Sequence, residues 1–340
     1  MNSNIKQPLV LATAGLGLAL AGRALYRRMN RLNLAGRTVL ITGGSRGLGL
    51  VLARQFAAEG ANLILCGRNK DKLLQAGKEL FEKGANVSCV TCDVTQPEQV
   101  QDMVTQIEQH FSSIDVVVNN AGIIQVGPME SMERQDYQET MQTHFYGPLH
   151  VIEAVLPGMR KRGAGRIVNI SSVGGRISLP HMLPYSASKF ALVGYSLGLR
   201  SELAKEGIGV VTVCPGMMRT GSPQNAYFKG QHEAEYALFK ISDSLPLVSM
   251  SSERAARQIL KACQHNDGFL VLGLHTKLAE KLYALCPGLM ADALGVVNRI
   301  LPAAGPAGSV KKQGSESQSR WSESWLTELT QKAAERNNEL

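Results

Sequence analysis

The chain has 340 residues, which is long enough to bury a full hydrophobic core, and 19% of them are charged. The net charge of +8 arises mainly from the first 37 residues, which contain six basic and no acidic side chains. Of the 36 basic residues, 30 lie beyond this segment against 28 acidic ones, a net charge of +2. A nucleic-acid-binding face on the main body is therefore excluded.

An uncharged, mostly apolar run extends from Gln7 to Gly22 and is followed by a cluster of arginines. Its 16 residues fall just short of the ~17–25 that span a bilayer, and a snorkelling Arg23 extends the span to Tyr26. We expect residues 1–33 to form a membrane anchor, with the arginines and the following domain in the cytoplasm. Two alternatives stay open. The sequence ALA within the run fits a signal-peptidase site, and the arginine-rich, acid-free start also resembles an organelle transit peptide.

Six cysteines are scattered along the chain, which is typical of reduced thiols in a cytosolic setting. Cys89 and Cys92 have a spacing that invites a redox or zinc interpretation. They lie, however, in the strand-like run NVSCVTCDV, where an offset of three directs two side chains to opposite faces. No other residues with metal-ligand spacing accompany the pair, so we expect no metal site.

From Arg37 onward, short β-branched runs alternate with longer amphipathic stretches. The strand candidates are TVLIT, NLILC, NVSCVT, DVVVN, RIVNIS and GVVTVC. This alternation predicts βαβ units, and hence a single α/β domain over residues 34–273. We expect a Rossmann-like, doubly wound parallel sheet of about seven strands with helices on both faces, and ligands outside the carboxyl ends of the strands.

The C-terminal segment, residues 274–340, continues beyond this domain. Residues 274–302 predict one or two apolar helices interrupted at CPG, and residues 303–320 predict a flexible Pro/Gly/Ser-rich linker. The last segment, residues 321–340, predicts an amphipathic helix with Trp321 and Trp325 on its apolar stripe. Helix packing or partner docking is the expected role of these tryptophans.

A glycine-rich turn follows the first predicted strand, in TVLITGGSRGLGLVLARQF. Gly43, Gly47 and Gly49 permit a tight turn and a close backbone approach, so that amide N–H groups and the helix dipole can meet a pyrophosphate. At the end of the second strand, LILCGRNK offers Arg68 and no acid that would hold a ribose 2′-hydroxyl. With Arg46 inside the glycine turn, this pattern predicts NADP(H) rather than NAD.

Five ordered motifs now identify a family. They are TGGSRGLG at 42–49, NNAG at 119–122, SS ending at Ser172, YSASK at 185–189 and PGMMRT at 215–220. In this order, with 13 positions from Ser172 to Tyr185, they resemble the short-chain dehydrogenase/reductase family in its NADP-preferring type. The resemblance covers Leu34 to Phe269 and implies an NADP-dependent oxidoreductase.

The resemblance also implies roles for individual residues. Asp93 resembles the residue that contacts the adenine ring, and Asn119 resembles the first Asn of a motif that stabilises the sheet. The segment with Pro215, Gly216 and Thr220 resembles the one that holds the nicotinamide carboxamide. The other residues expected to bind the cofactor are Gly43, Ser45, Arg46, Gly47, Leu48, Gly49, Arg68, Asn120, Tyr185 and Lys189.

Ser172, Tyr185 and Lys189 resemble the catalytic serine, tyrosine and lysine of the family. On a helix, Lys189 lies beside Tyr185, with about 5–6 Å between Cβ atoms. Lowering a phenol pKa from ~10 to about 7 requires roughly 4 kcal/mol of preferential phenolate stabilisation. The ammonium group and an oxidised nicotinamide can supply that in a dry site. We expect Tyr185 to protonate the carbonyl oxygen while NADPH delivers hydride, with Ser172 bonded to the alkoxide and Lys189 holding the nicotinamide ribose.

One position departs from the family pattern. In MQTHFYG, His144 stands where the resemblance implies an asparagine as the fourth catalytic residue, which helps to hold a water in the proton relay, partly through its backbone carbonyl. The histidine keeps this carbonyl and adds a titratable nitrogen. The alternative function is therefore a catalytically impaired NADP(H)-binding scaffold in which His144 marks lost chemistry.

The sequence gives the least direct information about the substrate. Residues 221–250 occupy the usual place of the substrate lid, and the apolar residues Met217, Met218, Phe228, Tyr236 and Phe239 suit either an adaptable wall or a packed core. An anchor with an apolar lid favours a lipophilic ketone such as a 3-ketoacyl lipid, a sterol or a retinoid. A homo-oligomer is the default expectation for this family.

Overall fold

The computed structural model describes residues 17, 21–22, 25, 27, 31–306 and 308–340. The membrane anchor expected within residues 1–33 therefore lies mostly outside the described residues. Among the residues that are described, no helix has both the length and the apolar character needed to cross a membrane.

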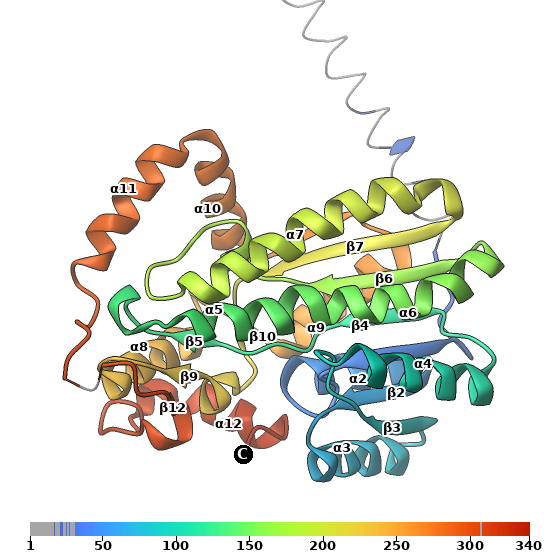
Figure 1. Cartoon of the computed structure of the whole chain (residues 1–340), viewed down its shortest axis with the longest axis horizontal. Coiled ribbons are helices and arrows are strands. Elements are labelled where there is room, and N and C mark those ends of the chain that lie inside the picture. Colours follow the sequence, from blue (N-terminus) through green and yellow to red (C-terminus); the bar gives the residue numbers. More distant parts are fainter. Residues whose placement is uncertain (1–16, 18–20, 23–24, 26, 28–30, 307) are drawn as a thin grey trace, which may run out of the picture.

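A seven-stranded sheet in the order β11-β7-β6-β4-β1-β2-β3 forms the centre of the molecule (Figure 1). Every neighbouring pair in it is parallel. In chain order the strands are β1 (Thr38–Thr42), β2 (Asn62–Gly67), β3 (Val87–Thr91), β4 (Val116–Asn119), β6 (Gly165–Ile170), β7 (Ile208–Pro215) and β11 (Phe269–Leu272). The predicted doubly wound α/β fold is confirmed.

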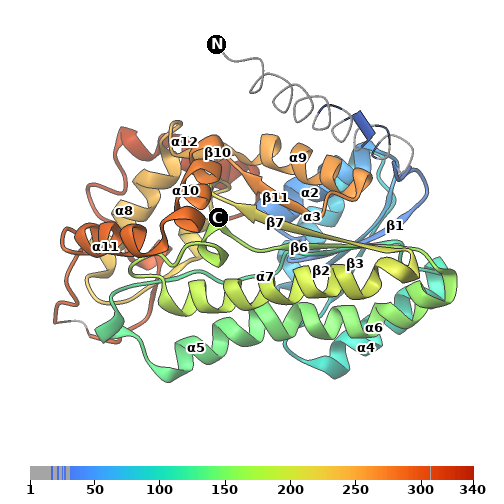
Figure 2. The same cartoon turned by 90° about the horizontal axis from the view of Figure 1, so that it is seen from above.

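Helices cover both faces of the sheet (Figure 2). One face packs against α2 (Gly47–Ala58), α3 (Lys70–Glu82) and α9 (Ser252–His265), and the other against α4 (Pro97–Phe111), α6 (Gly147–Arg162) and α7 (Leu183–Leu203). Strands buried on both faces need continuous apolar runs, and all eight residues of β7 are buried. Cys89 packs into the first core and Cys92 into the second, so the expected opposite orientation is confirmed.

The strand order reverses beside β1. The chain lays β2 and β3 on one side of β1, then crosses to build β4, β6, β7 and β11 on the other. The loops after β1 and β4 diverge at this point and leave a crevice at the carboxyl ends of the strands. The crevice is where such sheets bind ligands, and the glycine turn and NNAG both lie there.

Further elements, residues 217–251, form a covering layer over the crevice. After β8 (Met217–Arg219) come β9 (Tyr227–Phe228), α8 (His232–Ser244) and β10 (Ser249–Ser251), and β9 pairs with β5 (Gln125–Val126). Phe228 and Tyr236 are buried together with Phe239 packed against them, and Met218 packs on the main core. Of the two interpretations of these apolar residues, the structure favours core packing.

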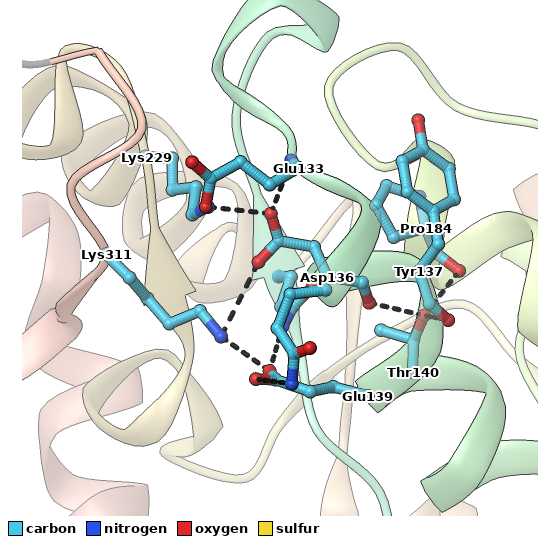
Figure 3. A network of polar contacts seen from close by, with 10 residues as sticks. Glu133, Asp136, Tyr137, Glu139, Thr140, Pro184, Lys229 and Lys311 are labelled. Atoms are coloured by element: carbon cyan, nitrogen blue, oxygen red, sulfur yellow. Dashed lines mark hydrogen bonds and ion pairs between the residues drawn. The ribbon is translucent and has the colours of Figure 1, made fainter.

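A buried ion-pair network connects α5 (Arg134–Met141) to this covering layer (Figure 3). Asp136 is 1% exposed, and its Oδ2 accepts hydrogen bonds from Lys229 Nζ at 2.7 Å and from the Glu133 N–H at 2.8 Å. Lys311 Nζ lies 3.5 Å from the same carboxylate and 2.5 Å from Glu139. Burial raises the pKa of Asp136, but these partners outweigh it and hold the pKa below its ordinary value. The network therefore connects the covering layer to α5.

The C-terminal segment contains two apolar helices, α10 (Leu274–Leu285) and α11 (Pro287–Asn298), separated at Cys286. Within residues 303–320, expected to be a linker, Lys312–Gln313 forms β12 and pairs with β9. The last helix, α12, spans Glu328–Arg336 and is shorter than the segment 321–340. The final four residues leave this helix and reach the glycine turn after β1.

Candidate active site

The glycine turn connects β1 to α2 and has the backbone that only glycine adopts readily. Gly43 has φ +63° and Gly47 has φ +52°. Gly49 is needed for another reason, because a Cβ there would collide with the carbonyl oxygen of Gly43. The turn thereby presents the first N–H groups of α2 to the crevice, where they can meet an anion.

Asn120 holds this turn in place from the end of β4. Its Nδ2 donates to the carbonyl oxygens of Thr42 and Gly43, both at 3.1 Å. The Thr42 hydroxyl in turn accepts from the Asn120 N–H at 3.0 Å. The sequence implied cofactor contact for Asn120, and the structure gives its side chain a clear positioning role.

Asn119, one residue earlier, begins a buried polar chain. Its Nδ2 donates to Asn169 at 2.8 Å, Asn169 Nδ2 donates to Ser196 at 2.9 Å, and the hydroxyls of Ser196 and Thr212 are 2.7 Å apart. These residues come from β4, β6, α7 and β7. Because buried polar groups are costly unless paired, the chain fixes α7 on the sheet, and α7 carries the predicted catalytic pair.

A cavity of about 410 Å³ occupies the crevice and brings most of the predicted site together. The predicted residues that line it are Gly43, Ser45, Arg46, Gly47, Leu48, Arg68, Asp93, Asn120, His144, Tyr185, Lys189 and Thr220. Four predicted residues are not among its lining residues: Gly49, Ser172, Pro215 and Gly216. Gly49 supports the turn from behind, and Gly216 packs against Thr276 at the start of α10.

Sequence reasoning missed other residues that line the same cavity, among them three polar residues from distant parts of the chain. Lys72 on α3, Asn225 in the covering layer and Glu339 near the C-terminus all border it. No local sequence motif predicts a role for these three residues. A larger cavity of about 840 Å³ shares these three residues but contains none of the predicted catalytic residues.

Tyr185 and Lys189 lie one turn apart on α7, as predicted. Lys189 Nζ is 5.8 Å from the centre of the Tyr185 ring and donates to the Ile170 carbonyl at 3.0 Å. Ser172 lies beside them, because a Cβ added at Gly174 would be 3.1 Å from the tyrosine ring and 3.5 Å from the serine Oγ. The three side chains therefore converge at the end of β6.

Burial has the largest effect on the pKa values of Tyr185 and Lys189. It raises the pKa of Tyr185, against a hydrogen bond with the Ser172 hydroxyl that lowers it, so the residues of the chain do not by themselves lower this pKa as expected. Burial also lowers the pKa of Lys189, to about 8. A neutral phenol is favoured in this environment, which suits a group that donates a proton to a substrate oxygen.

His144 is 1% exposed and lies in a π-helical turn, Gln142–Tyr146, between α5 and α6. The Ile123 N–H donates to its Nε2 at 3.1 Å, so its Nδ1 carries the proton and donates to the Ser188 hydroxyl at 2.7 Å. Ser188 donates to the Tyr185 carbonyl at 2.8 Å. Burial, with Lys189 nearby, holds the pKa of His144 well below its ordinary value. The imidazole is therefore neutral and fully bonded.

The His144 backbone is exceptional as well. Four residues on stands Pro148, which has no N–H, so the His144 carbonyl lacks its usual α-helical donor. The π-helical turn accommodates this break in the helix. The carbonyl expected to take part in the proton relay is thus not committed to an α-helical bond.

The remaining predicted residues lie around the rim. Asp93 follows β3, and its Oδ1 accepts from the Thr95 N–H at 3.0 Å. Arg68 is exposed at the end of β2. Thr220 is 4% exposed, and its Oγ1 accepts from the Ser222 N–H at 3.2 Å.

A doubly wound sheet, a glycine turn after its first strand and a tyrosine and lysine over the crevice define a dinucleotide-binding oxidoreductase. A family profile described as short chain dehydrogenase matches residues 37–229. Dehydrogenase/reductase SDR family member 7B of Danio rerio is 34% identical over 289 residues, which are 83% of this chain and 91% of the relative. The chain belongs to the short-chain dehydrogenase family.

Two solved structures extend this similarity to the fold. A gluconate 5-dehydrogenase from Burkholderia cenocepacia, in complex with NADP and tartrate, has a TM-score of 0.65 and 27% identity, covering 74% of this chain and 99% of its own. A variant of actinorhodin polyketide ketoreductase with NADPH has a TM-score of 0.62 and 30% identity, covering 70% and 95%.

Proposed function

We propose that this oxidoreductase interconverts a carbonyl and a secondary alcohol with NADP(H), acting mainly as a reductase of lipophilic ketones. The observation that carries the proposal is the convergence of Tyr185, Lys189 and Ser172 at the carboxyl ends of the strands. The cavity on that edge is also lined by Arg46 and Arg68. A proton donor and a phosphate-binding edge thus share one crevice.

In reduction, the bound cofactor supplies the hydride. Tyr185 donates its phenolic proton to the carbonyl oxygen, and the Ser172 hydroxyl donates a hydrogen bond to the same oxygen as negative charge develops there. Lys189, one helical turn away, stabilises the resulting phenolate and holds the nicotinamide ribose. Solvent then returns the proton to Tyr185 through a relay in which the backbone carbonyl of His144 would hold a water by accepting a hydrogen bond from it.

Charge supports NADP(H) as the cofactor. The end of β2 reads GRNK, with Arg68 where NAD-binding sheets place an acid. A second arginine, Arg46, lies on the glycine turn after β1. Lys72 adds a third cation at the rim of the cavity. Both solved relatives described above are complexes with NADP or NADPH.

The lining supports a ketone with apolar groups. Ile123, Ile124, Met218 and Ala226 border the cavity next to its polar residues. The similarity to a polyketide ketoreductase agrees with a 3-ketoacyl compound as one member of this class. A sterol-like ketone fits the same description.

The test is NADPH oxidation by the full chain over a panel from small aryl ketones to long-chain 3-ketoacyl compounds and steroid ketones. Tyr185→Phe removes the proton donor and is expected to lower kcat on the best substrate about 10²–10⁴-fold. Tyr195→Phe makes the same change on the same helix, outside the residues that line the cavity, and is expected to retain activity.

Two results would count against the proposal. Equal loss in the Tyr185 and Tyr195 variants would mean that Tyr185 has no special chemical role. Tight NADPH binding without turnover of any ketone would favour the scaffold alternative.

A further inference from the structure

The last four residues of the chain, here called the tail (residues 337–340), occupy the cofactor crevice. The Gly47 N–H, at the start of α2, donates to the Asn337 carbonyl at 2.8 Å. Asn338 Nδ2 donates to the Ser45 carbonyl at 2.9 Å. The tail is therefore bound to the glycine turn itself, and Figure 1 marks the C-terminus close to α12.

Glu339 is placed as an anionic ligand of this turn. Its side chain is 4% exposed, and its Oε2 lies 3.5 Å from Arg46 Nη1. Asn225 Nδ2 donates to both this oxygen and the Glu339 carbonyl, each at 2.7 Å. A Cβ added at Gly47 would collide with the other carboxylate oxygen. The carboxylate thus lies directly against the backbone that the glycine leaves open.

A second cation holds the end of the tail. Lys72 Nζ donates to the Leu340 carbonyl at 2.8 Å and to the Asn338 carbonyl at 3.2 Å. Arg54, on α2, donates to the Asn337 side chain at 3.0 Å. Contacts to the tail therefore come from α2, α3 and the covering layer.

These contacts have the chemistry of a phosphate site. Backbone N–H at a helix N-terminus, a guanidinium and an ammonium are the groups that bind phosphate oxygens. A carboxylate in the same space both blocks and repels a phosphate. Since NADP(H) carries three phosphate groups, the dinucleotide and the docked tail exclude one another.

We propose that the tail is an internal competitor for the cofactor, which binds the phosphate edge of the crevice through Glu339 and has to leave before NADP(H) enters. The inference rests on the proposed function, because it takes NADP(H) as the ligand. Arg46 and Lys72 then serve two anions in turn, and Lys72 becomes a cofactor-binding residue.

The docked carboxylate is a replaceable ligand. Burial raises the pKa of Glu339 more than Arg46 and Lys72 lower it, so the ionised carboxylate is less stable here than in water. The apparent association constant for NADP(H) equals the intrinsic constant multiplied by the fraction of molecules whose tail is undocked.

Three full-length proteins and one shortened protein test the proposal: the unsubstituted chain, Glu339→Gln, Glu335→Gln and a chain that ends at Arg336. Glu335 is exposed on α12 and does not line the crevice, so its variant is the matched control. The measurement is the Kd for NADPH by fluorescence titration. Glu339→Gln is expected to bind about tenfold more tightly, the shortened chain at least as tightly, and Glu335→Gln like the unsubstituted chain.

Hydrogen exchange provides a second readout on the unsubstituted chain. Saturating NADPH is expected to speed exchange at the amides of residues 337–340, because the tail is displaced. Unchanged or slower exchange there would overturn the proposal even if the variants folded poorly.

The binding data separate the two proposals. If all four proteins bind NADPH equally, the tail is not a competitor, whereas the NADP(H) assignment stands. Weaker binding by Glu339→Gln would overturn the proposal in the opposite direction, since the tail would then close over the cofactor. If none of the four binds a nicotinamide dinucleotide, both proposals fail together.

Discussion

At the scale of single residues, Arg68 gives the cleanest test of cofactor choice, because the structure gives no contact between it and the tail. Arg68→Ala is expected to raise the KM for NADPH roughly 10–100-fold and to leave the KM for NADH unchanged, since a charge-assisted hydrogen bond to phosphate contributes about 1.5–3 kcal/mol. Steady-state kinetics with both cofactors measure the ratio. Arg254→Ala, an exposed arginine on α9, is the control. An equal effect on both cofactors would contradict a role at the 2′-phosphate.

His144 leads to a second prediction, because its two ring nitrogens are both bonded. His144→Phe leaves the Ile123 N–H and the Ser188 hydroxyl without their partner and is expected to lower the free energy of unfolding by about 1–3 kcal/mol. His144→Asn keeps part of the bonding and is expected to cost less. Denaturant unfolding compares the two variants.

The same residue has a kinetic signature. Because burial holds the pKa of His144 well below its ordinary value, the imidazole stays neutral across the neutral range. The pH profile of kcat between pH 6 and 9 is therefore expected to be the same for His144→Asn and the unsubstituted chain. A transition near pH 6.5 that vanishes in the variant would show that the imidazole does titrate.

Motif spacing predicted the residues that converge through local structure. The YSASK segment forms one turn of α7, and the glycine turn follows directly from β1, so short-range geometry was sufficient. Lys72 and Glu339 could not be found in this way. Their partners lie far away along the chain, as in the bond from Lys72 to Leu340. Nothing in the local sequence of either residue encodes that meeting.

At the scale of elements, α8 and α12 meet at a buried carboxylate, Asp243. It is 3% exposed and accepts from Thr330 Oγ1 at 3.0 Å. Burial raises its pKa to about 7, although Thr330 and Arg219 lower it, and Glu339 adds to the rise. The folded state thus binds a proton that the unfolded chain releases at lower pH.

The raised pKa of Asp243 determines how the stability of the fold changes with pH. Because the folded pKa is above the unfolded value, this group favours folding at low pH, and that contribution is lost as the pH rises from about 4 to about 7. Asp243→Asn is expected to be more stable than the unsubstituted chain at pH 8, by up to about 4 kcal/mol, and similar at pH 4.5. Unfolding curves at both pH values measure this. Asp292→Asn, an exposed position on α11, is the control, and a gain of equal size there would contradict the argument.

Patterns predicted the regular elements better than the irregular ones. The six β-branched runs became strands of the central sheet because parallel strands covered on both faces require continuous apolar sequence. The elements around the crevice gave no such signal. Strand β12 has only two residues, Lys312–Gln313, and exists because it pairs with β9 of the covering layer. Long-range pairing of this kind is invisible to local propensity.

At the scale of the whole molecule, the fold brings the glycine turn and the C-terminal tail to the same edge of the sheet. The reversal of strand order beside β1 opens the crevice, and the C-terminal segment returns across the covering layer to fill part of it. Residues near the two ends of the described chain are thereby coupled. A change in how α12 packs, for example at its contact with Asp243, is expected to alter access to the glycine turn.

Charge distribution supports a last prediction, which concerns the segment proposed as a membrane anchor. A chain that begins at residue 31 lacks the apolar run and four basic residues, Lys6, Arg23, Arg27 and Arg28. Each basic residue near an anionic surface contributes about 1 kcal/mol of attraction, and the apolar run adds burial in lipid. The full chain is expected to sediment with phosphatidylserine-containing vesicles, and the shortened chain to stay in the supernatant.

The alternative outcome would be equally informative. Helices α10 and α11 expose large apolar side chains, among them Leu274, Leu285 and Leu289 at 84%, 78% and 70%. If the shortened chain still sediments with vesicles, and does so at high salt and without anionic lipid, these helices rather than the N-terminal segment hold the protein on the membrane. Binding lost on shortening and weakened by salt would instead assign the attachment to residues 1–30.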